Sequence, residues 1–169
     1  MHFQRIKTGG VKISDKLLRI HIANPLNREK EQCRLCRILA GEKISILFLT
    51  IDRKGGHICT SCCVELEHEE RVRALIESEA VMKDHARFTP AVGLLSMFPH
   101  QSQLQVLGVS LHALGKANLP ILDLSSSLAA LSFVLKYEHL KRALTALSEF
   151  LVFPADSVHL RSTVHVRQA

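Results

Sequence analysis

An internal repeat constrains the fold of this chain more than any other feature of its sequence. Each half of the chain shows the same order of patterns: a strand, a helix, two strands joined by a turn, and a second helix. The first helices align at an offset of 75 residues, which pairs Leu39 with Leu114, and the second helices align at 69, which pairs Arg73 with Arg142. Two copies of one supersecondary pattern predict two similar structural units.

The first copy begins with a strand of alternating character. Leu18, Ile20 and Ile22 alternate with Arg19 and His21, which is the pattern of a half-buried strand. The sequence then predicts a helix over about 27–41, a strand over 44–51, a turn at 52–56, a strand over 57–66, and a helix over about 69–79. A fourth strand is expected near 80–88.

The second copy begins with an apolar strand over 91–98. Leu104, Leu107, Leu111 and Leu114 then recur at helical spacing, which predicts a helix over 102–116. Strands are expected over 121–124 and 128–137, a helix over about 138–150, and a fourth strand over 150–153. Residues 1–13 and 157–167 have the pattern of extra strands that tie the ends of the chain together.

Each copy therefore has the order βαββαβ, which is the ferredoxin-like split βαβ arrangement. The predicted fold class is α+β, with two ferredoxin-like units whose sheets are antiparallel and whose helices lie on one face. We place the first unit, with an N-terminal extension, at residues 1–88. The second unit, with a C-terminal extension, is placed at 89–169.

Composition excludes several classes of protein. No apolar run approaches the roughly 18–20 residues of a membrane span, and the longest, Ile44–Ile51, has the length of a strand. Residues 1–7 lack the apolar segment of a secretory signal. The five cysteines are an odd number, which favours reduced thiols over a disulfide framework. A cytoplasmic protein that does not contact membranes is the expectation.

The net charge of +6 is concentrated near the N-terminus. Residues 1–37 contain nine Lys and Arg against three acidic residues, whereas the remainder balances 13 against 13. Such a segment could attract nucleic acid. However, no aromatic residues are interleaved with these charges to stack on bases. A solvated charged face is the simpler interpretation, and nucleic acid is not an expected partner.

Two CxxC pairs, Cys33/Cys36 and Cys59/Cys62, have a spacing that suits a tetrahedral zinc site. The first pair lies in the helix expected over 27–41, and the second lies in the strand expected over 57–66. Because successive side chains of a strand point to opposite faces, Cys59 and Cys62 would point apart. We expect buried thiols and no metal. A zinc-stabilised nucleic-acid-binding module is the alternative.

Three further stretches carry a resemblance to a known family. They are Gly10–Ser14, Leu114–Ile121 and, most specifically, the serine turn and following strand of Asp123–Leu135. With these residues the chain, over about 10–152, resembles the paired regulatory ACT domains of aspartokinases. The resemblance implies two ACT units that bind a small-molecule effector, an amino acid in the family's usual case, and modulate an attached or associated enzyme. It implies no catalytic residues and no cofactor, and no Ser/His/Asp or Cys/His constellation stands out from the sequence.

The family's effector loop reads acidic-x-Pro-Gly at the start of the first helix, where free N–H groups and the helix dipole attract a carboxylate. The equivalent segments here are 27–30 and 102–105, and Lys30 and Gln105 replace the glycine. The candidate ligand-binding residues are Asn27, Arg28, Lys30, Ser45, Ser102, Gln103, Gln105, Ser125, Ser126 and Ser127. A ligand-free structural adaptor is the alternative that these replacements leave open. Exposed sheet edges predict side-by-side pairing, and hence a homodimer.

Overall fold

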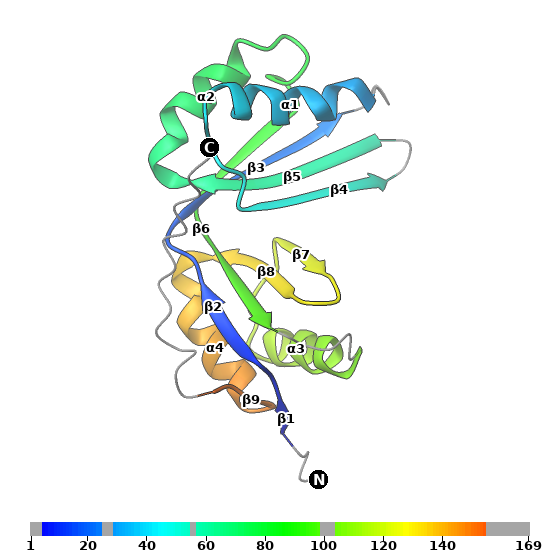
Figure 1. The fold of residues 1–169 in the computed structure, drawn as a ribbon, viewed down its shortest axis with the longest axis vertical. Helices are drawn as coiled ribbons and strands as arrows, with labels where there is room; N and C mark the ends of the chain where they lie inside the picture. The colour runs from blue at the N-terminus through cyan, green and yellow to red at the C-terminus, as the bar shows by residue number, and fades with distance from the viewer. Residues whose placement is uncertain (1–4, 25–28, 55–56, 99–103, 155–169) are drawn as a thin grey trace. The chain divides into compact units, whose positions relative to one another are not determined.

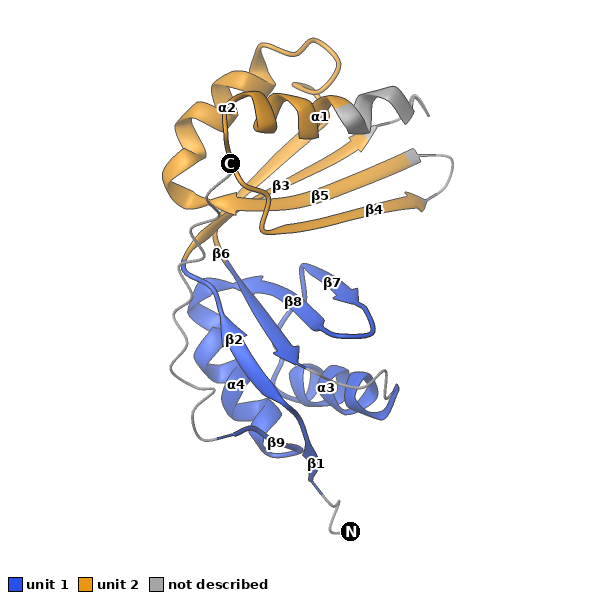
Figure 2. Cartoon of the chain, viewed as in Figure 1, with its two compact units in different colours: residues 1–15, 93–169 blue, residues 16–92 orange. Residues whose placement is uncertain are grey.

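The computed structural model describes residues 5–24, 29–54, 57–98 and 104–154. The chain forms two compact units, one of residues 16–92 (orange in Figure 2) and one of residues 1–15 together with 93–169 (blue in Figure 2). We call the orange unit, labelled unit 2 in the figure, the first unit, because it comes first in the repeat, and the blue unit the second unit. Each is described by itself. In the described segments no helix has both the length and the apolar character required to cross a bilayer.

The first unit has the βαββαβ order that the sequence predicts (Figure 1). Its elements are β3 (Leu17–Asn24), α1 (Glu29–Gly41), β4 (Phe48–Lys54), β5 (His57–Glu65), α2 (Glu69–Glu77) and the first half of β6 (Ala86–Phe98). The strands lie in the order β4-β5-β3-β6, and each neighbouring pair is antiparallel. This is a ferredoxin-like sheet, as expected.

The alternation in β3 sets which face of this sheet is buried. Leu18, Ile20 and Ile22 pack in one cluster with Leu35 and Leu39 of α1. The cluster also takes Val72 and Ile76 of α2. Both helices therefore cover the same face, and burial of their apolar stripes is the main contribution to the stability of the unit.

The second unit repeats this order from the second half of β6 onward. It contains α3 (Leu104–Lys116), β7 (Asp123–Ser126), β8 (Leu131–Lys136), α4 (Leu140–Ser148) and β9 (Leu151–Val152), together with β1 (Ile6–Lys7) and β2 (Gly10–Ile13). Its sheet has β8 between β6 and β7, and β2 pairs with the other edge of β6. Phe133, Leu135 and Met97 pack against Leu114 and Leu147 in its core.

The fourth strand of the second sheet is not the one that the sequence predicts. Segment 150–153 was expected in that place, but β9 instead forms a two-stranded parallel sheet with β1. The fourth position is taken by β2, in which Gly10 pairs with Phe98 and Ile13 pairs with Leu95. Residues 1–15 consequently group with 93–169, whereas the sequence-based division placed them with residues up to 88. A strand of four residues carries no local signal for its partner.

The strands expected separately at 80–88 and 91–98 form one continuous strand, β6. Residues 80–85 form turns instead of a strand. Pro90 lies within this strand, and the structure accommodates it with a bulge. Ala91 has a φ of 53°, and the register against β3 shifts between Leu17 and Arg19. An added residue on one strand is the usual way in which a strand bends without ending.

The ends of the first helices confirm the repeat. Lys43 and Asn118, 75 residues apart, have φ values of 56° and 53°. In each case the next N–H, of Ile44 or Leu119, bonds a carbonyl five residues earlier, at 2.9 and 3.0 Å. This is the left-handed helix termination that usually requires Gly or Asn.

The second half of each repeat aligns at a different offset from the expected one. α2 and α4 both have nine residues and begin 71 residues apart, and the 3₁₀ turns before them, Leu66–His68 and Tyr137–His139, share that offset. The predicted offset of 69 is wrong by half a helical turn. The buried positions decide the true value, because Val72 and Ile76 match Ala143 and Leu147. The strand expected at 44–51 also begins later, at Phe48.

Candidate functional site

The candidate ligand-binding residues fall into groups according to what the structure describes. Asn27, Arg28, Ser102 and Gln103 lie outside the described residues. Lys30 lies in the first turn of α1, but its side chain also lies outside the described part. In the second unit, Gln105 is exposed in the first turn of α3. At the two helix starts the structure therefore describes the backbone of α1 and α3 and the side chain of Gln105.

Ser45 lies far from the start of α1. It is exposed in the connection between α1 and β4, after the helix has ended. α1 has 13 residues, so its ends are separated by roughly 20 Å at the usual rise per residue. A single small ligand cannot contact both Ser45 and the first turn of α1 within the first unit.

The serines of the second unit lie at the correct end for a shared site. A helical crossover joins parallel strands, so β6 and β7 run in the same direction on either side of α3. The end of β7, with Ser125 and Ser126, therefore lies at the same end of the unit as Gln105 at the start of α3. Figure 1 shows the β7–β8 hairpin projecting toward that end.

Of the three serines, Ser127 already has hydrogen-bond partners within the hairpin. The Ser127 N–H donates to the Ala130 carbonyl at 2.8 Å, and the Ser127 Oγ accepts the Ala130 N–H at 3.1 Å. These bonds close the hairpin turn. Ser125 lies opposite Ser132, whose hydroxyl bonds that of Ser96 at 2.7 Å. Ser126 is exposed at the end of β7. A ligand would reach Ser126 without displacing an observed bond.

The second cysteine pair lies as the strand prediction requires, whereas the side chain of Cys33 in the first pair is outside the described part of the chain. Cys59 and Cys62 both lie in β5, a regular strand that pairs residue by residue with β3 and β4. Cys62 belongs to the core beneath the helices, and Cys59 is half-buried on the opposite face. The prediction that this CxxC pair divides between two faces is confirmed. The pair therefore cannot act as a bidentate zinc knuckle.

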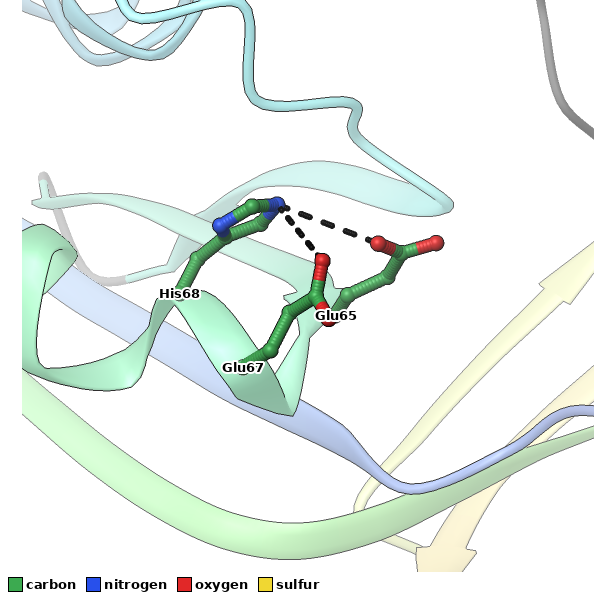
Figure 3. Close-up of side chains that lie close together, drawn as sticks. All are labelled: Glu65, Glu67 and His68. Atoms are coloured by element: carbon green, nitrogen blue, oxygen red, sulfur yellow. Dashed lines mark ion pairs between the residues drawn. The ribbon is translucent and has the colours of Figure 1, made fainter.

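One cluster of possible metal ligands was missed by the sequence reasoning. Glu65, Glu67 and His68 have ligand atoms within 4.8 Å of one another (Figure 3). The His68 Nε2 lies 3.8 Å from an oxygen of Glu65 and 3.7 Å from an oxygen of Glu67. The 3₁₀ turn at 66–68 brings them together, and it leaves no clear periodic pattern in the sequence.

The repeat shows what this cluster represents. In the second unit His139 Nε2 lies 3.7 Å from Glu138, and Lys136 occupies the place of Glu65. The Glu–His contact thus recurs in the second unit, but a lysine stands in place of the third possible ligand, and its positive charge would repel a metal ion. We interpret the cluster as a feature of the turn that starts α2 and α4.

The comparisons define the class of fold. The two ferredoxin-like units have the fold seen in solved regulatory subunits and domains of aspartate kinases. Among solved structures, the chain is similar to the ligand-free regulatory subunit of aspartate kinase from Thermus thermophilus. The TM-score is 0.76 at 15% identity, over 86% of this chain and 99% of that chain. The corresponding subunit from Thermus flavus gives a TM-score of 0.74 at 15% identity, over 84% of this chain and 97% of that one.

A longer protein shows the same fold in part. Aspartokinase III of E. coli, in complex with lysine and aspartate, matches with a TM-score of 0.63 at 13% identity. The match covers 86% of this chain and 33% of that chain. At these identities the likeness establishes the fold. No protein-family model and no curated protein sequence matches the chain.

Proposed function

We propose that this chain is a non-catalytic regulatory protein of the tandem ACT type, which binds a small molecule such as an amino acid and modulates a partner enzyme. One observation carries the proposal. The fold of a regulatory subunit of aspartate kinase is matched over 99% of that subunit and over 86% of this chain, with a TM-score of 0.76.

The chemistry of the helix starts supports an anionic ligand group. The first N–H groups of α1 and α3 have no partner within their helices, and the helix dipole adds positive potential there. Arg28 and Lys30 bring two positive charges to the start of α1 and Glu29 and Glu31 bring two negative ones, whereas Ser102, Gln103 and Gln105 at the start of α3 are neutral. The net charge of the two helix starts is therefore the same, and we expect stronger carboxylate binding in the first unit only through direct contact with Arg28 or Lys30.

The same loops set the range of ligands. E. coli aspartokinase III is seen in complex with lysine and aspartate, so amino acids are the first ligands to test here. A glycine in the effector loop would let the ligand approach the backbone closely, whereas Lys30 and Gln105 have side chains there. We therefore expect the ligand to contact these side chains.

The partner and assembly belong to the same proposal. β4 and β7 are the edges of their sheets, and each presents exposed leucines, Leu49 and Leu124. Edge strands of this kind favour pairing with a second copy. We propose a cytoplasmic homodimer that acts on an enzyme. Sedimentation equilibrium tests the dimer directly, with a monomer at micromolar concentration as the contrary result.

The experiment for ligand binding is thermal denaturation of the whole chain against a panel of amino acids. A ligand at 100 times its Kd stabilises by about 2.7 kcal/mol. For a chain of this size such a change raises the Tm by roughly 5–10 °C. Arg28→Gln should reduce the shift, whereas Arg37→Gln, which removes an exposed arginine of α1, should retain it.

Two outcomes would contradict the proposal. If no amino acid raises the Tm, the ligand-free adaptor becomes the better account of the fold. If both arginine variants lose the shift equally, the effect is general electrostatics and the helix start is not the site.

A further inference from the structure

The helix α3 of the second unit presents two leucines to solvent. Leu104 is 81% exposed and Leu111 is 40% exposed. A surface helix normally turns its leucines toward the core and its polar residues outward. At the offset of 75, the first unit has Glu29 and Cys36 at these places, so the exposed leucines are not a consequence of the shared fold.

Two glycines complete the same face of α3. Gly108 and Gly115 alternate with Leu104 and Leu111 at spacings of four, three and four residues, so all four lie in one stripe along the helix. Among the described residues, nothing lies within 4 Å of a Cβ placed on either glycine. Each glycine is therefore a hollow between exposed leucines. We call Leu104, Gly108, Leu111 and Gly115 the Leu–Gly face.

The Leu–Gly face points outward and leans away from α4. It lies opposite Val106 and Ala113, which are buried in the core. His112 is about 100° around the helix from Leu111, and its ring packs edge-on against Phe150 at 5.5 Å. Because Phe150 follows α4, which packs beside α3, the His112 side of α3 is the side nearest α4.

The edge strand β7 lies on the same flank of the unit. Leu140 of α4 is the nearest side chain to Gly93 of β6, so α4 lies over β6. β7 is on the other side of β8 from β6, and α3 lies on this side of the helix layer. Leu124 of β7 is opposite the core residue Phe133, so it is on the helix-covered face, where it is 37% exposed. Leu124 therefore continues the apolar surface of α3 onto the edge of the sheet.

A second copy of α3, running antiparallel, fits the Leu–Gly face. A two-fold axis through the middle of the stripe sets Leu104 opposite Gly115 of the second copy. The same axis sets Leu111 opposite Gly108 of the second copy, and symmetry makes each contact occur twice. Spacings of four and three residues are those of helices that cross at about 20°, as in coiled coils. A parallel pair would instead set leucine on leucine and glycine on glycine, which leaves steps and gaps.

The charges of α3 do not oppose this pairing. Lys116 is the only lysine, arginine or acidic residue of the helix, and its Nζ lies 3.2 Å from an oxygen of Glu149. In an antiparallel pair the two Lys116 side chains lie at opposite ends, roughly 20 Å apart at the usual helical rise. No charged side chain is thus placed between the two Leu–Gly faces.

The size of the contact requires both the helix and the strand. A helix of 13 residues offers a face of roughly 20 Å by 10 Å, which is small beside the roughly 800 Å² that each partner buries in a standard interface. The edge of β7 has hydrogen-bonding groups that a second β7 can pair with. Both elements face the same flank, so one two-fold axis can serve both.

We propose that the Leu–Gly face of α3 and the adjoining edge of β7 form the interface with a second copy of this chain. The inference rests on the proposed homodimer and names its surface. It selects the second unit over the edge strand β4 of the first unit. In α1, the residues at the places of Gly108 and Gly115 are Cys33 and Ala40, with no leucine between them at the place of Leu111.

Sedimentation equilibrium of the full chain tests this interface with the variant Gly108→Gln. Small residues let packed helices approach closely, so alanine at this place is tolerated but a longer side chain is not. Gly108→Gln should raise the Kd of the dimer by about tenfold or more. Glutamine favours a helix over glycine, so the circular dichroism spectrum should be retained. The matched control is Gly41→Gln, which changes an exposed glycine of α1 with nothing within 4 Å of its Cβ, and this variant should dimerise as the wild type does.

An exchange of knob and hollow tests the register of the two helices. Gly108→Leu alone should weaken the dimer, because the new leucine would meet Leu111 of the second copy. Adding Leu111→Gly moves the hollow to position 111 and should return the Kd to within about threefold of the wild-type value, since the two positions are coupled. A double variant as weak as Gly108→Leu alone would overturn the antiparallel pairing.

The remaining outcomes separate this interface from the proposed homodimer. A Gly108→Gln dimer as tight as the wild type would overturn the interface and leave the homodimer in place, with β4 as the next surface to test. Equal weakening in Gly41→Gln would also overturn it, because the effect would not be specific to α3. A wild-type chain that stays monomeric would contradict the homodimer and this interface together, while ligand binding is measured separately by the thermal shift.

Discussion

Gly93 at the centre of β6 allows a direct test of how the two units divide their core volume. A Cβ at this position would lie 2.4 Å from Leu140 Cδ1 and 3.1 Å from Tyr137 Cδ2. Under the repeat its equivalent is Leu18, while Tyr137 and Leu140 correspond to Leu66 and Glu69. In the first unit the large apolar side chain at this place, Leu18, comes from the strand. In the second unit the strand has glycine, and the large side chains Tyr137 and Leu140 come from the turn and the helix.

Gly93→Ala should therefore destabilise the protein. Carbon atoms in contact normally lie 3.5–4.0 Å apart, so the added methyl forces a displacement of more than about 1 Å. Leu140 is only 3% exposed and has little room to move. Overpacking of this kind costs about 1–3 kcal/mol, and alanine returns about 0.5–1 kcal/mol through the entropy of the unfolded chain. The net expectation is a loss of about 0.5–2 kcal/mol.

Urea denaturation followed by circular dichroism measures this change. With an m value of about 1–3 kcal/mol/M, the midpoint should fall by several tenths of a molar unit or more. Gly108→Ala is the control, since nothing lies within 4 Å of its Cβ on the exposed side of α3. That variant should gain about 0.5–1 kcal/mol. A Gly93→Ala protein as stable as the wild type would refute the reasoning. The reasoning would also fail if Gly93→Ala cost as much stability in a Leu140→Ala background, where the clashing side chain is absent, as it does in the wild type.

Three other predictions concern single features of the fold. Lys43→Gly should raise the free energy of unfolding by about 1 kcal/mol, and Asn118→Gly should raise it by less, because asparagine tolerates positive φ. Equal changes for the two variants in a urea titration would count against the repeated helix ending. Ser132→Ala should cost about 1–2 kcal/mol of stability, because it leaves the buried Ser96 hydroxyl without its 2.7 Å partner. Replacing both serines with alanine should cost less than twice that amount. Full additivity in the double-mutant cycle would contradict a direct bond between the two hydroxyl groups. Cys62, with no exposed surface, should react with a thiol reagent only as fast as the protein unfolds, and rapid labelling in native buffer would show that β5 is not a central strand.

Local patterns in the sequence were sufficient for most of the elements. The alternation of Leu18, Ile20 and Ile22 predicted β3 and the face that it buries, and the leucine spacing predicted α3. The prediction of a strand over residues 57–66 is also confirmed, since β5 spans His57–Glu65. These signals are local because one side of each element faces a core, and the period of that contact is visible in the chain.

Pairing between distant segments could not be predicted in this way. The placement of β2 beside β6 depends on contacts across more than 80 residues, and nothing in the four residues of β2 specifies them. The continuity of β6 through Pro90 depends on the bulge at Ala91, which alanine does not signal. The later start of β4 follows from Ile44, which is buried although it lies outside any strand.

The candidate site divides along the same line. Sequence reasoning placed the candidate ligand-binding residues at the helix starts and in the serine turn, and in the structure α3 begins and β7 ends at one end of their unit. The structure separates Ser45 from the residues at the start of α1, because the whole length of α1 lies between them. Neighbours across strands could not be found from sequence, since residues such as Arg19 and Arg87 come close only through the register of β3 and β6.

Amide chemical-shift mapping of the full chain during titration with the amino acid that most raises the Tm is the most direct test of the account. We predict that the perturbed amides cluster at the first turns of α1 and α3 and at the end of β7, with saturation at a defined stoichiometry. Shifts that are absent with every amino acid, or that fall on amides away from these segments, would contradict it.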